Sequence, residues 1–233
     1  MYVQYARELN PEDFDPPVAA KVHLILVHAG NISRSIHELI GVISDQTWIE
    51  RLGVIPRASF ERTALRTIAQ LVAQFRAADN KLNSNIGEYL VSVSAAQGME
   101  ESFGHKVFPI SELWKEKVSN NHGFDFHTES NFEVISFGEA KYNSNSNPYD
   151  DAADQVLRFL ADGKHLGDAV CLQYFVSSNS MENLVCQDVR GAAIAFSLSA
   201  VNPLGVLSNC LDNPNVIKLA GLCDELYVVG VIL

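Results

Sequence analysis

Three acid-x-Lys triplets occur in the sequence, and one of them falls on a predicted strand. Glu139 and Lys141 close the segment FGEAK, and strand side chains two residues apart project from the same face. The triplets Asp79–Lys81 and Asp162–Lys164 fall at a helix end and in a glycine turn, which do not hold side chains rigidly. The pair of Glu139 and Lys141 therefore indicates half of a metal-dependent hydrolytic site, with a surface ion pair of little value as the alternative.

A second carboxylate, Asp125, closes the strand-like segment before this one. If the two strands pair through a turn around residues 128–132, Asp125 stands beside Glu139. Two adjacent carboxylates repel each other unless a divalent cation lies between them, and oxygen ligands suit Mg²⁺ or Mn²⁺. Lys141 could then orient or deprotonate the attacking water and stabilise the transition state. Each carboxylate also has a purely structural alternative, as a strand-end residue or part of an ion pair.

Glu88 is a third candidate ligand, on a predicted helix earlier in the chain. It reaches the same cation only if that helix packs against the two strands, and otherwise it is a solvated helix residue. We expect the helix to begin near Asn83 or Ser84, which suit the N-cap, and to end near Gly98.

The elements that position these residues follow from hydrophobic periodicity and turn signals. The sequence predicts a strand over 19–30, helices over 57–77 and 82–99, strands over 123–130 and 131–142, a helix over 148–161, and strands over 168–178 and 225–233. Asn147 and Pro148 suit the N-cap and first position of the third helix. The last strand is placed at a sheet edge or beside 19–30. This order predicts an α/β fold with a mixed central sheet flanked by helices.

Asp125, then Glu139-Ala140-Lys141 on the next strand, then a helix and a buried strand, resembles the PD-(D/E)xK nuclease superfamily. In that family the core runs helix, strand, strand, strand, helix, strand, the Asp and Glu bind the metal, and the Lys serves catalysis. Glu88 matches the acidic residue that many members carry on the first core helix. The resemblance implies a restriction-endonuclease-like core over about 83–176, within a single domain of residues 1–233 that adds an N-terminal strand and helix and a C-terminal strand.

The same resemblance implies hydrolysis of phosphodiester bonds with Mg²⁺, for which Mn²⁺ can substitute. It implies Asp125, Glu139 and Lys141 as catalytic residues, and Glu88, Asp125 and Glu139 as metal ligands. Gln155 resembles the Gln of the family's QxxxY helix motif, although Phe159 stands in place of the Tyr. An exposed helix glutamine is the alternative for Gln155.

Two positions leave the family pattern or stay open. Phe124 stands where many members have a Pro before the Asp. His127 shares a strand face with Asp125, and its role is open between a surface or hydrogen-bonding histidine and part of the site.

The segments GFDF and GEAKY are also similar to the HamA-type nuclease subunits of bacterial anti-phage systems, which act beside a superfamily 2 helicase. The chain carries a net charge of −11, and its basic residues gather between residues 51 and 81. Because phosphate contacts need clustered Lys and Arg, we expect a helicase partner to supply much of the affinity for nucleic acid. DNA is the expected substrate, with RNA left open. The alternative is a catalytically degenerate nuclease fold that serves as a non-enzymatic interaction subunit.

Other classes of site lack support. The histidines do not form an HExxH pair, the four cysteines have no zinc-finger spacing, and GxxxxGK[ST] and GxSxG motifs are absent. The sequence therefore does not predict a zinc protease, an ATPase or a serine hydrolase. It also has no secretory leader and no apolar run that could cross a bilayer, which together with scattered cysteines predicts a reducing cytoplasm and no membrane partner.

Overall fold

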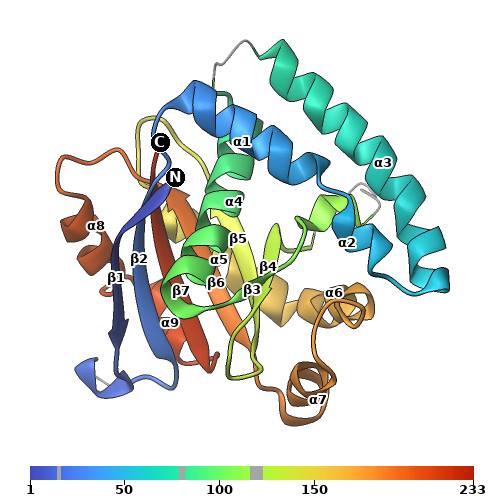
Figure 1. Cartoon of the computed structure of the whole chain (residues 1–233). Coiled ribbons are helices and arrows are strands. Elements are labelled where there is room, and N and C mark those ends of the chain that lie inside the picture. The colour runs from blue at the N-terminus through green and yellow to red at the C-terminus, as the bar shows by residue number, and fades with distance from the viewer. Residues whose placement is uncertain (15–16, 79–81, 116–122) are drawn as a thin grey trace.

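In a computed structural model of the chain, residues 1–14, 17–78, 82–115 and 123–233 are described (Figure 1). Within them, seven strands form one mixed sheet in the order β1-β2-β7-β6-β5-β4-β3. The strands are β1 (Tyr2–Leu9), β2 (Lys21–His28), β3 (Lys106–Val107), β4 (Phe126–Glu129), β5 (Ile135–Lys141), β6 (Gly191–Ser197) and β7 (Glu225–Ile232). The coarse prediction of an α/β fold with a mixed sheet is confirmed.

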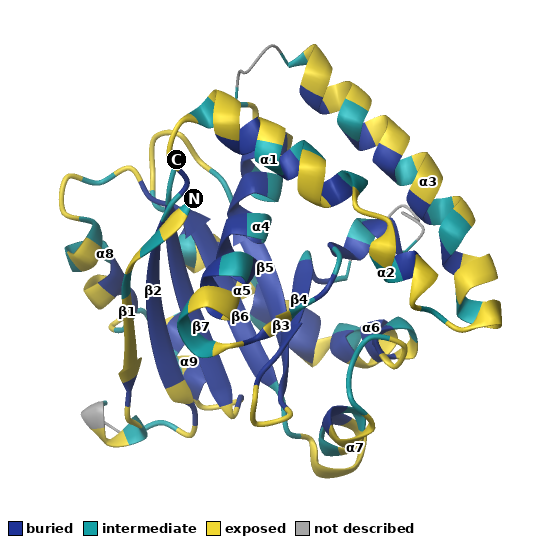
Figure 2. Cartoon of the chain, viewed as in Figure 1, coloured by how far each residue is buried: buried dark blue, intermediate teal, exposed yellow. Residues whose placement is uncertain are grey.

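The centre of the sheet is parallel and its two margins are antiparallel. Strands β2, β7, β6 and β5 pair in parallel, whereas β1 pairs antiparallel with β2, and β4 and β3 continue antiparallel from β5. The central strands are buried on both faces, which explains their continuous apolar runs (Figure 2). The C-terminal strand β7 was predicted either at a sheet edge or beside the strand over 19–30. It lies beside that strand, β2, so the edge placement is wrong.

Helices cover both faces of the sheet. They are α1 (Ile32–Ser44), α2 (Thr47–Glu50), α3 (Val54–Ala77), α4 (Ser84–Phe103), α5 (Tyr149–Ala161), α6 (Lys164–Leu172), α7 (Ser178–Gln187), α8 (Pro203–Cys210) and α9 (Pro214–Ala220), with the 3₁₀ helices η1 (Pro11–Asp13) and η2 (Ser111–Leu113). Helix α4 packs its small residues on one face, against Ala140 and Val229, and α5, α8 and α9 cover the other face (Figure 1). In the described part of the chain, no helix is both long and apolar enough to cross a membrane.

The strand predicted over 168–178 is wrong, because this segment forms the end of α6, a turn and the start of α7. The buried residues of α6 are His165, Asp168, Ala169 and Leu172, at helical spacing. Two of them are polar, so the apolar residues alone do not reveal the helix. The strand that follows α5 in the sheet is β6, which begins at Gly191 after the helices α6 and α7.

Two helix boundaries also differ from the predicted ones. Asn83 caps α4, since its side chain accepts a hydrogen bond from the backbone N–H of Ile86, but the helix continues to Phe103. Gly98 lies inside α4, where a Cβ would stand 2.7 Å from Val27, so it permits close packing and does not end the helix. The N-cap of α5 is Pro148, since the side chain of Asn147 accepts instead from the N–H of Ser199. The triplet Asp79–Lys81 lies outside the described residues.

Candidate active site

The predicted meeting of Asp125 with Glu139 occurs at the ends of β4 and β5. The two strands pair with Phe126 opposite Gly138, and the N–H of Asp125 donates to the carbonyl of Gly138 at 2.9 Å. Asp125 Oδ2 accepts the N–H of Ala140, also at 2.9 Å. The carboxylate of Asp125 is therefore fixed against the backbone between Glu139 and Lys141.

Glu139 is a buried carboxylate, with 1% of its surface exposed. Its Oε1 accepts hydrogen bonds from Lys141 Nζ, at 3.0 Å, and from Gln155 Nε2 on α5. Its Oε2 is also buried and has no hydrogen-bond donor among the described residues. One oxygen thus accepts two hydrogen bonds and the other has no such donor, while the carboxyl of Asp125 lies within hydrogen-bonding reach of the carboxyl of Glu139.

The ionisation states of Asp125, Glu139 and Lys141 depend on one another. Burial, together with the negative charge of Asp125, raises the pKa of Glu139 well above its usual value. Burial also raises the pKa of Asp125, although the N–H of Ala140 opposes this. For Lys141, burial lowers the pKa, but the charges of Glu139 and Asp125 outweigh it and the pKa rises. Both shifts favour a proton or a cation shared between the two carboxyls, and the raised pKa of Lys141 favours its charged form.

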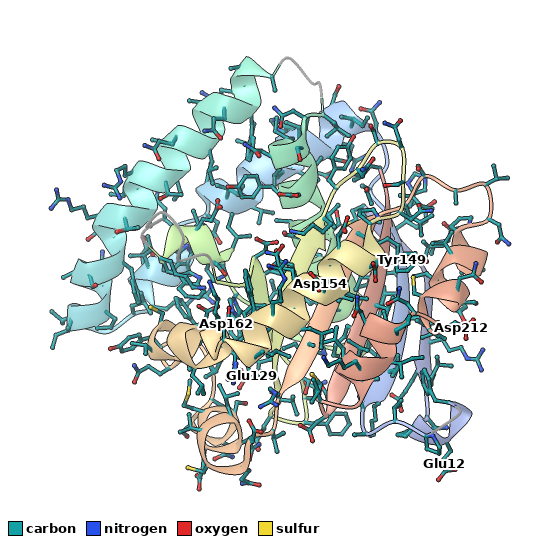
Figure 3. All side chains as sticks on the ribbon, turned by 180° about the vertical axis from the view of Figure 1, so that it is seen from behind. Glu12, Glu129, Tyr149, Asp154, Asp162 and Asp212 are labelled. Carbon is teal, nitrogen blue, oxygen red and sulfur yellow. The ribbon has the colours of Figure 1, made fainter. Side chains whose placement is uncertain are left out.

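Gln155 was left open between a motif residue and an exposed helix glutamine. It lies on the half-buried side of α5 and donates to Glu139, so the exposed alternative is wrong. Figure 3 views the molecule from behind, where α5 lies in front of the sheet and carries the labelled Asp154. Asp154 is exposed and pairs with Arg158, whereas Gln155 next to it is half-buried and contacts Glu139.

Glu88 lies near this group without joining it. Glu88 is half-buried on α4, and its negative charge contributes to the raised pKa of Lys141. Gly87 brings α4 close to the end of β5, because a Cβ there would stand 2.1 Å from the Tyr142 ring. Within the described residues, no group of three or more His, Cys, Asp or Glu side chains could hold a metal ion. The structure thus brings together Asp125, Glu139 and Lys141 and leaves Glu88 at one side.

A cleft of about 420 Å³ opens beside these residues, and we call it the α3 cleft. Its lining comes from α3, α4 and η2, and includes Glu88, Lys115 and Asp125. Asp125 is half-buried and lines the cleft, so it is the carboxylate through which a ligand in this space would meet the site.

His127 belongs to a second buried cluster that the sequence did not predict. Its Nε2 lies 2.9 Å from Asp168 Oδ2 and its Nδ1 lies 3.2 Å from Ser111 Oγ. Asp168 also accepts the N–H of Phe124 at 3.2 Å and pairs with Lys115. Burial lowers the pKa of His127, which is therefore neutral here. The cluster fixes the segment that leads into Asp125, so His127 is a hydrogen-bonding core residue.

The sequence analysis did not identify Asp168 as a buried, hydrogen-bonded residue, because it predicted a strand over 168–178. A carboxylate inside the otherwise apolar segment DAVCL was the available signal, since a buried charge needs partners. All four cysteines carry free thiols, and Cys210 and Cys223 are buried.

Comparison of the chain with protein families, with curated proteins and with solved structures gives no match.

Proposed function

We propose that the chain is a Mg²⁺-dependent nuclease that hydrolyses phosphodiester bonds, with Asp125, Glu139 and Lys141 as its catalytic residues. The observation that carries this proposal is the buried carboxyl of Glu139, which lies within hydrogen-bonding reach of the carboxyl of Asp125 and whose Oε2 accepts no hydrogen bond in the described part of the chain. Such a pair needs either a shared proton or a cation between its oxygens. Hard oxygen ligands of this kind suit Mg²⁺ or Mn²⁺.

The order of elements supports a restriction-endonuclease-like core. The chain runs α4, β3, β4, β5, α5 and then β6, which is helix, three strands, helix and strand. The helices α6 and α7 come before the last of these strands, so such a core would extend to Ser197, beyond the limit of 176 expected from the sequence. Strand β6 pairs in parallel with β5, and so lies directly beside the strand that carries Glu139.

The contacts of these residues support a proposed role for each of them. Mg²⁺ held by Asp125 and Glu139 would supply Lewis-acid activation of a water and of the phosphate. Lys141, which stays charged, would orient that water and stabilise negative charge as it develops. Gln155 and Lys141 together fix one oxygen of Glu139, which holds the carboxylate plane. Glu88 stays the expected supplementary ligand, although among the described residues it does not complete a three-residue metal-holding group with Asp125 and Glu139.

A cleavage assay tests the proposal. Single-stranded and duplex DNA and RNA are incubated with the purified chain in Mg²⁺, Mn²⁺, Ca²⁺ or EDTA. We expect EDTA to abolish cleavage, Mg²⁺ or Mn²⁺ to restore it, and Ca²⁺ to restore it poorly. Lys141→Ala should also remove cleavage. Full cleavage in EDTA, or unchanged cleavage by Lys141→Ala, would contradict the mechanism.

We further propose that the chain acts on DNA as a subunit of a bacterial anti-phage complex that includes a helicase. The acidic balance of the chain, −11, supports a partner that contributes affinity for nucleic acid. The non-enzymatic alternative keeps one specific support, since a third metal-ligating side chain is lacking from the group within the described residues. Cleavage of none of the substrates, with a folded protein and an intact partner complex, would favour that alternative.

A further inference from the structure

The backbone around Asp125 is held on both sides by groups outside its own strand pair. Before it, the N–H of Phe124 donates to Asp168 Oδ2 at 3.2 Å. After it, the carbonyl of Asp125 accepts the N–H of Ser111 at 3.1 Å. Asp125 lines the α3 cleft, so these two contacts, which come from α6 and η2, fix the segment that brings its carboxylate to a ligand there.

His127 joins the two contacts into one network. Its Nε2 lies 2.9 Å from Asp168 Oδ2, and its Nδ1 lies 3.2 Å from Ser111 Oγ. Because a carboxylate only accepts hydrogen bonds, Nε2 carries the hydrogen and donates to Asp168, and Nδ1 accepts from the hydroxyl of Ser111. The groups that hold the backbone before and after Asp125 are therefore connected through one imidazole ring.

Asp168 is the centre of this network. It is 5% exposed, on the buried face of α6. Besides the hydrogen bonds with Phe124 and His127, it forms an ion pair with Lys115 through Oδ1. Gly123 leaves room for this pair, because a Cβ there would stand 2.5 Å from Asp168 Oδ1. A buried carboxylate surrounded by these donors cannot rotate without leaving one of them unpaired, so it is a rigid support.

The carboxylate of Asp125 lies where a strand partner is missing. The pairing of β4 with β5 ends at Phe126 opposite Gly138, so β4 has no residue opposite Ala140. Asp125 Oδ2 accepts the N–H of Ala140 instead, at 2.9 Å. A displaced Asp125 would therefore leave this N–H to water and would take its own carboxylate away from Glu139.

The order Ser, His and Asp also occurs in the catalytic triads of serine hydrolases. Here Ser111 is 4% exposed, His127 is fully buried, and neither side chain lines the α3 cleft. A substrate carbonyl therefore cannot reach the hydroxyl of Ser111. The contacts of the network lead to the backbone of Asp125, which favours a supporting role.

We propose that Asp168 is a positioning residue for Asp125, which it holds directly through Phe124 and indirectly through His127 and Ser111. The proposal rests on the proposed nuclease function, in which Asp125 binds Mg²⁺. It deepens that function by adding a residue of α6 that acts through this ligand. Groups that hold a metal ligand in place commonly contribute about tenfold to a hundredfold to metal affinity.

Asp168→Asn and His127→Phe test the network. An asparagine has one acceptor oxygen, which the ammonium of Lys115 attracts most, so its NH₂ group would face the N–H of Phe124 and could not accept from it. His127→Phe keeps an aromatic ring and removes both hydrogen bonds, and it changes no charge because burial lowers the pKa of His127. Leu172→Val is the control, because this buried residue of the same helix contributes packing and no side-chain hydrogen bond.

The first measurement needs no metal. Amide hydrogen exchange, followed by NMR, compares the N–H of Ala140 with that of Leu226, which is buried in β7 between two neighbouring strands. We expect exchange at Ala140, relative to Leu226, to be at least about tenfold faster in Asp168→Asn and His127→Phe than in the wild type. In Leu172→Val both amides should change together, because that variant lowers the stability of the whole domain.

The second measurement is the affinity for Mg²⁺, by isothermal titration calorimetry at a temperature at which every variant is folded. Asp168→Asn and His127→Phe should bind Mg²⁺ at least about tenfold more weakly than the wild type, and Leu172→Val should bind it equally well. His127→Phe is decisive here, because Asp168→Asn also removes a negative charge that attracts the cation.

The outcomes separate the positioning role from the nuclease. A wild-type exchange ratio in both network variants, or wild-type Mg²⁺ affinity in His127→Phe, overturns the positioning role. Faster exchange at Ala140 in both network variants, with no Mg²⁺ binding even by the wild type, supports the positioning role and contradicts the metal mechanism. Ser111→Ala, which removes one hydroxyl from the same network, repeats both measurements if Asp168→Asn or His127→Phe fails to fold.

Discussion

Glu139 makes most of the side-chain contacts within this site. It is buried, one of its oxygens accepts hydrogen bonds from a lysine and a glutamine, and its carboxyl lies within hydrogen-bonding reach of the carboxyl of Asp125. Its raised pKa means that a proton and a cation compete for this carboxyl in the folded chain. Occupancy of the pair by metal is therefore expected to fall as the pH falls through the range in which Glu139 becomes protonated.

Glu139→Gln is the most direct residue-scale prediction. Glutamine keeps the shape of a protonated glutamate but cannot ligate through a charged oxygen, so cleavage should fall by at least about a hundredfold. Without metal, the melting temperature should stay the same or rise slightly, because the repulsion from Asp125 is gone. Calorimetry with and without Mg²⁺ checks both parts, since Mg²⁺ should raise the melting temperature of the wild type and not of the variant.

The matched control for this experiment is Glu182→Gln, on the exposed surface of α7. It removes one carboxylate outside the site, and both cleavage and the Mg²⁺ response should persist. A Glu139→Gln chain that still melts higher in Mg²⁺ would mean that the cation binds elsewhere.

At the scale of elements, the site depends on how closely α4 approaches the end of β5. Gly87→Ala should force α4 away, because the new Cβ would stand 2.1 Å from the ring of Tyr142. We expect a loss of about 1–3 kcal/mol in unfolding free energy, together with lower cleavage. Gly41→Ala on α1 is the control, since its Cβ meets no described atom within 4 Å and should stabilise the helix by about 0.5–1 kcal/mol. Urea denaturation of both variants distinguishes them, and equal stabilities would refute the close packing.

A second element-scale prediction concerns His23 on β2. Its ring stacks on Tyr227 with 4.5 Å between centroids, and neither ring nitrogen has a hydrogen-bond partner in the described structure. Burial, partly opposed by Glu8, lowers its pKa from 6.5 to about 4. As the pH falls the unfolded chain binds this proton first, so stability is lost between about pH 6.5 and 4, by up to about 3 kcal/mol.

His23→Phe cannot bind that proton, so its stability should fall less over the same pH range. The comparison must be made as a difference from the wild type, because the raised pKa of the buried Glu225 acts in the opposite direction. Parallel stability curves for the two proteins, from urea denaturation at several pH values, would contradict the neutral buried state of His23.

How much the sequence could predict differs between elements for physical reasons. The strand pair that carries Asp125 and Glu139 was predictable, because strand alternation and the turn fix which side chains meet. The helix α6 was not, because its buried face includes His165 and Asp168, whose partners lie far away in sequence. The donors to Glu139 were only partly predictable, since Gln155 lies on another element and the packing of α5 decides where it points.

The molecule as a whole is acidic, with its described arginines between residues 51 and 78 all exposed on or beside α3. Most of the surface therefore repels a polyanion, while one helix attracts it. The isolated chain should bind DNA weakly, with a Kd on the order of 10⁻⁵ M at physiological salt, comparable to non-specific binders. Anisotropy titrations at several salt concentrations check this, and tight binding by the chain alone would remove the need for a partner.

The register of β1, β2 and β7 has a consequence for the connectivity of the chain. Tyr2 lies opposite His28 on one side, and Ile232 lies opposite His28 on the other, so the chain ends are two strand spacings apart, about 10 Å. A linker of about four residues could join them into a closed ring. Reopening that ring between Ala200 and Val201, in the exposed loop after β6, would create new ends far along the chain from both catalytic strands. Such a circular permutant should fold, with a melting temperature close to that of the wild type, and should keep the Mg²⁺ response that depends on Glu139.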